Sequence, residues 1–233
     1  CEEILSGLGV PDHVLFREVI SRCNELHQPF FAAVLTASNH PPVIIPKNID
    51  FSSKQEDIDL VSVQYADWSI GQFLKNVRKE KWFDSTIFVF LADHGRFVTG
   101  WVHDMPVSYY HIPLIIFAPG ILKENKKFDQ LGSQVDLLAT LMGILNFDFV
   151  NTTLGMDILK EKREFVFFNA DNNLGCLNDS LFYVQRESGV NSLYYYRNND
   201  INDYLGKYPE FAAGMKKYAE SMMQAAQDLQ SSK

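Results

Sequence analysis

The tripeptide Asp93-His94-Gly95 places a carboxylate directly beside an imidazole. A hard anionic oxygen and a borderline nitrogen form a ligand pair that suits Zn²⁺ or Mn²⁺. We expect Gly95 to let the backbone turn sharply, so that both side chains face one point. The same residues can also form a turn that the aspartate side chain caps. The tripeptide alone therefore leaves a metal site and a simple turn as alternatives.

The position of the tripeptide along the chain favours a site. Residues 86–92 form an apolar run that is typical of a buried strand in a parallel sheet. Open α/β sheets bind their ligands just beyond the carboxyl ends of such strands. Asp93 and His94 are therefore expected at the edge of the sheet where ligands bind.

Two further apolar runs, 29–36 and 111–118, also predict strands. The first is followed by His40-Pro41-Pro42, and since proline cannot continue a ladder, His40 should lie at a strand end, as His94 does. The second is closed by Pro119-Gly120, whose turn chemistry ends a strand.

Helical periodicity predicts helices over 11–24 and 57–79, and another that begins after Ser133 as N-cap, with Asp136 in its first turn. Beyond residue 160 the helices stop alternating with strands. Short strand-like runs at 165–168, 181–185 and 192–196, a polar stretch at 169–178 and a helix within 204–229 follow. We therefore expect an α/β fold with a mostly parallel sheet sandwiched by helices and a small C-terminal antiparallel annex.

Composition excludes several classes of protein. The net charge of -8 and the lack of a clustered basic stripe make nucleic acid an improbable partner. The three cysteines, Cys1, Cys23 and Cys176, form neither a metal motif nor a disulfide-dense pattern. No apolar stretch approaches the roughly 20 residues that span a bilayer.

Four segments resemble, in the same order, the C-terminal half of the catalytic domain of lipoteichoic acid synthase-type phosphoglycerol transferases. That family belongs to the sulfatase-like branch of the alkaline phosphatase superfamily. The segments are Thr36 to Pro42, Asp84 to Gly95, Tyr110 to Gly120 and Gln134 to Leu141. The resemblance implies that residues 1–160 are the C-terminal part of a sulfatase-like catalytic domain, and that 161–233 are an annex and helix of the same domain.

The resemblance also implies a metal site. The family holds one divalent ion, commonly Mn²⁺, through an early acidic residue, a nucleophilic threonine and the Asp-His pair. Asp93 and His94 are therefore the expected metal ligands, with Zn²⁺ or Mg²⁺ as the other candidate ions. The family's threonine lies upstream of every matching segment, so the catalytic nucleophile is not identified in this chain.

Three further residues are predicted to bind substrate. The resemblance places His40 against the substrate phosphate; the alternative is a histidine satisfied by the backbone of its turn. His103 lies in the loop 96–107, where the family often has a histidine, and a solvated loop histidine is its alternative. Arg96 could pair with phosphate through its planar fork, or simply be a surface arginine. Trp101 could form part of the pocket wall or simply pack.

The expected function is that of a metal-dependent phosphoglycerol transferase or phosphodiester-cleaving enzyme that acts on a lipid-linked glycerophosphate. The expected setting is extracytoplasmic, with a membrane anchor upstream, and the expected partner is the N-terminal remainder of the catalytic domain. One alternative is a sulfatase, whose Cys/Ser-x-Pro-x-Arg motif is not present around any of the cysteines here. Another is an inactive domain that binds a glycan or phospholipid. The sequence leaves the acceptor, the natural substrate and the oligomeric state open.

Overall fold

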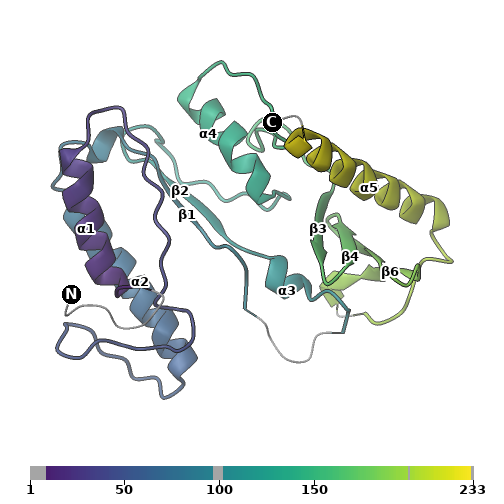
Figure 1. Cartoon of the computed structure of the whole chain (residues 1–233), viewed down its shortest axis with the longest axis horizontal. Coiled ribbons are helices and arrows are strands. Elements are labelled where there is room, and N and C mark those ends of the chain that lie inside the picture. The colour runs from purple at the N-terminus through teal and green to yellow at the C-terminus, as the bar shows by residue number, and fades with distance from the viewer. Residues whose placement is uncertain (1–8, 97–101, 199, 232–233) are drawn as a thin grey trace. The chain divides into compact units, whose positions relative to one another are not determined.

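The chain forms two compact units, shown in the computed structural model, which describes residues 9–96, 102–198 and 200–231 (Figure 1). The first unit consists of residues 1–89 and 116–125, and the second of residues 90–115 and 126–233. Each unit has a core of its own. The division predicted at residue 160 stays a prediction.

The helices are α1 (Asp12–Glu25), α2 (Ile58–Val77), α3 (Val107–Tyr110), α4 (Leu137–Leu145) and α5 (Pro209–Ser231). The strands are β1 (Phe88–Leu91), β2 (Leu114–Phe117), β3 (Val166–Ala170), β4 (Asn173–Leu177), β5 (Leu181–Gln185) and β6 (Asn191–Tyr195). Single 3₁₀ turns occur at Phe83–Ser85, Gln134–Asp136 and Tyr196–Asn198. Within the described residues, no helix has both the length and the apolar character needed to cross a membrane.

Helices α1 and α2 form the first unit and confirm the helical periodicity of the sequence. Asp57 caps α2 by accepting a hydrogen bond from the Asp59 backbone at 2.9 Å. The rings of Phe16 and Phe73, one from each helix, lie 4.9 Å apart. Phe88 of β1 lies 6.1 Å from Phe73, so the start of β1 belongs to the same aromatic core.

Strands β1 and β2 pair in a two-stranded sheet. They confirm the strands predicted over 86–92 and 111–118, although each is shorter than its apolar run. The boundary between the two units falls within both strands. Asp93 and His94 follow β1 directly, as expected.

The strand predicted over 29–36 is wrong for this structure. The segment forms no ladder with any described residue, and Phe31 and Leu35 are 87% and 84% exposed. An apolar run becomes a strand only when a neighbouring backbone completes its hydrogen bonds, and none does so here. The mostly parallel sheet is likewise not confirmed, because the registered strand pairs are antiparallel.

The second unit contains the predicted antiparallel annex, a sheet in the order β3-β4-β5-β6. Strand β4 falls in the polar stretch 169–178, for which no strand was predicted. The turn between β3 and β4 consists of Asp171 and Asn172, which have φ values of 49° and 61°. Tight two-residue hairpins need such left-handed residues, and asparagine and aspartate tolerate them.

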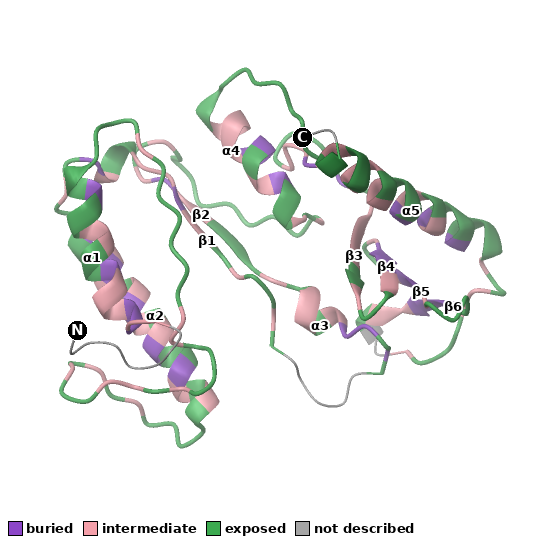
Figure 2. Ribbon diagram, viewed as in Figure 1, coloured by how far each residue is buried: buried purple, intermediate pink, exposed green. Residues whose placement is uncertain are grey.

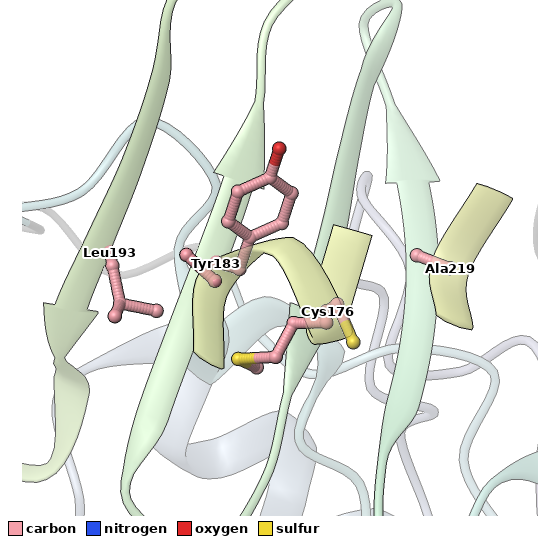
Figure 3. Packing of buried hydrophobic residues seen from close by; sticks show 6 residues of the cluster. Cys176, Tyr183, Leu193 and Ala219 are labelled. Carbon is pink, nitrogen blue, oxygen red and sulfur yellow. The ribbon is translucent and has the colours of Figure 1, made fainter. Parts of the chain in front are cut away.

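One face of this sheet packs against α5, whose buried residues follow one side of the helix (Figure 2). The shared core consists of Cys176, Tyr183, Leu193, Ala212, Met215 and Ala219 (Figure 3). The opposite face packs against Met105 and the residues around α3. The sheet therefore lies between α5 on one face and the residues around α3 on the other.

Candidate metal and phosphate site

One donor atom of Asp93 lies near one donor atom of His94. His94 Nε2 lies 3.8 Å from Asp93 Oδ2. The other ring nitrogen, Nδ1, lies 2.8 Å from the Gly95 carbonyl oxygen. With the proton assigned to Nδ1, this carbonyl accepts a hydrogen bond and leaves the lone pair on Nε2. Asp93 Oδ1 meanwhile accepts from the His94 backbone N–H at 2.9 Å, so Oδ2 remains available.

This pair suits a divalent ion in donor type. The two donor atoms lie 3.8 Å apart, so Asp93 and His94 would hold one ion at about 2 Å from each after a small approach of their side chains. The side chains of His94 and Asp93 are 50% and 75% exposed, so an ion can reach them. No group of three or more histidine, cysteine, aspartate or glutamate side chains that could hold a metal occurs among the described residues. The pair is therefore an incomplete set of ligands within this part of the chain.

Gly95 is required for a reason other than the expected sharp turn. Its φ is not in the left-handed region, which among the described glycines contains Gly9 and Gly189. A Cβ at this position would instead clash with the Ser108 carbonyl oxygen. The Gly95 N–H donates to the Tyr109 carbonyl at 2.7 Å, so the missing side chain lets the loop lie against α3.

Helix α3 also holds the histidine ring. The ring of Tyr109 stacks on that of His94, with centroids 4.7 Å apart and planes 20° apart. The neighbouring Tyr110 stacks on Phe168 of β3 at 4.2 Å, which anchors the short helix to the annex. The sequence placed Tyr110 only at the start of a strand segment, and no sequence pattern indicated the contact between Tyr109 and His94.

Gln134 contacts the backbone at the site. Its Nε2 donates to the Ala92 carbonyl at 2.9 Å and to the Asp93 carbonyl at 3.3 Å. The sequence predicted Ser133 as an N-cap, and the structure confirms that a helix begins there, through the 3₁₀ turn Gln134–Asp136. Two residues after Gln134, Asp136 is buried and paired with Arg163. Burial opposes the charge of Arg163, but hydrogen bonding and attraction to Asp136 outweigh it and raise the pKa of the guanidinium.

His40 lies in the first unit, whereas Asp93 and His94 lie in the second. Its turn is held by Asp12 of α1, whose carboxylate accepts from the backbone N–H groups of Ala37 and Ser38 at 3.3 and 3.1 Å. His40 Nδ1 lies 2.7 Å from the Pro41 carbonyl oxygen, and the residue is exposed. The ring thus has its turn-backbone contact, and contact with phosphate stays a prediction.

His103 has a different environment from the one expected. It is only 6% exposed, its Nε2 lies 2.9 Å from the Asp200 carbonyl oxygen, and its ring lies 4.4 Å from that of Tyr194. These contacts describe neither a solvated loop histidine nor a side chain open to substrate, and they favour a packing role in the annex. Arg96 follows the tripeptide directly and is exposed. Trp101 lies outside the described residues.

The chain has the α/β fold of the alkaline phosphatase superfamily. A protein of that superfamily from Vibrio parahaemolyticus matches 98% of this chain with a TM-score of 0.78 and 24% identity. The lipoteichoic acid synthase LtaP from Listeria monocytogenes matches 95% of it with a TM-score of 0.71 and 20% identity. The chain covers 57% and 60% of those two structures.

The model of the Sulfatase family matches residues 1–147, and the chain belongs to this family. Lipoteichoic acid synthase 2 from Bacillus subtilis (strain 168) is 28% identical over 192 residues, which are 73% of this chain and 29% of that protein. These matches confirm the resemblance found in the sequence. The chain spans less than a third of the length of that relative.

Proposed function

We propose that this chain is the C-terminal part of a metal-dependent enzyme that transfers or hydrolyses phosphate esters. The proposed reaction is phosphoglycerol transfer from a lipid-linked glycerophosphate, the chemistry implied by relatives named lipoteichoic acid synthases. The observation that carries the proposal is the pairing of Asp93 Oδ2 with His94 Nε2 at 3.8 Å, with the opposite ring nitrogen held by a carbonyl. A histidine ligand normally has its second nitrogen held in this way.

Asp93 and His94 would hold the ion, with Mn²⁺ as the proposed metal and Zn²⁺ or Mg²⁺ as alternatives. When bound, a divalent ion polarises a phosphoryl oxygen and lowers the pKa of a coordinated hydroxyl. Two protein ligands leave most of the coordination sphere to water, and the N-terminal remainder of the domain is the proposed source of the remaining ligands and the nucleophile. His40 and Arg96 are the proposed contacts to the phosphate, through an imidazole ring and a planar guanidinium.

The proposed setting is extracytoplasmic, on a protein anchored in the membrane by its upstream part. A lipid-linked substrate stays in the bilayer, so its glycerophosphate headgroup is presented at the membrane surface. A catalytic domain tethered beside that surface meets the headgroup at a high effective concentration.

The test compares Asp93→Asn with Asp148→Asn in the full-length protein. Asp93→Asn removes the anionic ligand while keeping the shape of the side chain, whereas Asp148 is an exposed carboxylate outside the site. We expect Asp93→Asn to lower Mn²⁺ content and to reduce release of diacylglycerol from phosphatidylglycerol vesicles by about 100-fold or more. Asp148→Asn should match the unmodified protein. Equal turnover in all three proteins would contradict the proposal.

A sulfatase is the second candidate, because the matched family model carries that description. A panel that offers an aryl sulfate beside a glycerophosphodiester to the same full-length protein separates the two reactions. Turnover of the sulfate ester alone would favour the sulfatase. Metal-independent binding of a glycan or phospholipid without turnover of either ester would instead favour the inactive binding domain.

A further inference from the structure

We propose that Gln134 is a positioning residue that fixes the backbone of the Asp93-His94 pair, and that the buried ion pair of Asp136 and Arg163 holds Gln134 in place. Its meaning for catalysis rests on the proposed function. The contacts themselves are a property of this chain and can be tested without turnover.

Gln134 holds the chain at the point where it leaves β1. Strand β1 ends at Leu91, so the carbonyls of Ala92 and Asp93 lie beyond its ladder. The Gln134 side-chain amide donates to these two carbonyls at 2.9 and 3.3 Å. Within β1, the neighbouring strand provides hydrogen-bond donors to the backbone carbonyls. Beyond the end of β1, the Gln134 amide provides the donor instead. Fixing these two peptide groups also fixes the direction in which the Asp93 side chain leaves the backbone.

Asp136 makes the 3₁₀ turn around Gln134 difficult to displace. Its side chain is 1% exposed and accepts hydrogen bonds from Ser133 N at 2.7 Å and Met156 N at 3.0 Å. Arg163 completes the set, with Nε at 2.8 Å from Oδ2 and with Nη2 bonded to Oδ1. Moving the turn would separate a buried ion pair and leave each charge without its partner, which is strongly unfavourable.

Arg163 connects this turn to the annex. Its Nη1 donates to the Tyr218 hydroxyl of α5 at 3.1 Å, and that hydroxyl donates to the Phe165 carbonyl at 3.1 Å. A Cβ at Gly155 would clash with the Val135 carbonyl, so the segment before Arg163 also lies directly against the turn. Two residues outside the annex therefore contact the pair, since Gln134 holds its backbone and Tyr109 stacks on its imidazole, and both lie on segments that contact the annex.

The experiment uses the full-length protein with Gln134→Met, which keeps the length of the side chain and removes the donor. Gln224→Met, at an exposed position of α5, is the matched control. Without added metal, amide exchange of residues 93–96 should become about fivefold faster in Gln134→Met, the change that the loss of one hydrogen bond brings. With Mn²⁺, the dissociation constant should rise about tenfold, as for other groups that orient a ligand. Unchanged exchange in Gln134→Met would overturn the proposal.

Arg163→Lys tests the second half of the proposal, since lysine keeps the charge but lacks the fork that binds Asp136. We expect faster exchange at 93–96 in this variant also, and a smaller than additive effect in the double variant with Gln134→Met, because both changes act through one contact. Additive effects would overturn the link through Arg163. Helical circular dichroism confirms that each variant is folded. If Arg163→Lys does not fold, Gln134→Met still decides the role of Gln134. Failure of the unmodified protein to bind Mn²⁺ would contradict the proposed function, whereas the exchange comparison would still decide the role of Gln134.

Discussion

Gly95 determines how closely α3 can lie to the proposed ligands. A Cβ here would meet the Ser108 carbonyl and would lie 3.3 Å from the His111 carbonyl, both of them rigid backbone atoms. Gly95→Ala should therefore push the loop away from α3 and weaken the stacking of Tyr109 on His94. We expect the free energy of unfolding, measured with urea, to fall by about 1 to 3 kcal/mol, together with weaker Mn²⁺ binding.

Gly214→Ala is the matched control for this change. Gly214 lies inside α5, and a Cβ there would meet no atom within 4 Å. Alanine in a helix interior is more favourable than glycine by roughly 0.5 to 1 kcal/mol, so this variant should be slightly more stable. If Gly95→Ala were as stable as Gly214→Ala, the close approach to Ser108 would not be what requires glycine.

The proposed ligand pair stands out in the sequence, but the residues that contact it do not. Asp93 and His94 are adjacent and directly follow an apolar run, so a local pattern was enough. Gln134 and Tyr109 act through contacts with residues 41 and 15 positions away, and neither residue type is unusual where it stands. Arg163 lies in the charged run Lys162-Arg163-Glu164, which is typical of a solvated surface, yet it is buried against Asp136.

At the scale of elements, Cys176 of β4, which packs against α5, makes the free energy of unfolding depend on pH. Burial raises the pKa of this thiol from its ordinary value of 9.0 to about 12. In the unfolded chain the thiol loses its proton first, so its contribution to stability is complete below pH 9.0 and is lost as the pH rises towards about 12. Cys176→Ala should remove this dependence. Over that range, the free energy of unfolding of the unmodified protein should fall more steeply with pH than that of Cys176→Ala. The difference in slope should be at most about 1.4 kcal/mol per pH unit.

Tyr183 sets the background for this measurement. Its pKa is also raised, to about 12, by burial and then by the nearby charge of Glu220. It stays in both proteins, so only the difference between their slopes reports on Cys176. If the stability curves of the two proteins were parallel between pH 9 and pH 12, burial would not raise the pKa of the Cys176 thiol in the folded protein.

The helices were predictable because each carries its own periodic pattern, as α1, α2 and α5 show. Strand β4 was missed because its asparagine and glycine resemble a loop, although Asp171-Asn172 before it is a hairpin signal. The strand expected at 29–36 has the opposite error. Its composition favours a strand, but composition does not supply the second backbone that a strand requires.

At the scale of the whole molecule, the segment 29–36 is exposed and forms no ladder with any described residue. Phe31 and Leu35 are 87% and 84% exposed, which is costly for two large apolar side chains in one short run. The solved relatives are longer, since this chain covers 57% and 60% of them. We propose that the N-terminal remainder of the catalytic domain pairs with 29–36 and completes it as a strand.

Amide hydrogen exchange tests this pairing. In the chain of 233 residues alone, the amides of 30–36 form no ladder with any described residue and should exchange rapidly. In the full-length protein they should be protected to nearly the same extent as the strongly packed helix α1, which serves as the internal reference in both proteins. Such protection would mean that pairing with the upstream half also positions the turn of His40, which directly follows the segment. Rapid exchange of 30–36 in the full-length protein would show that the N-terminal remainder does not pair with this segment. In that case no strand would position His40.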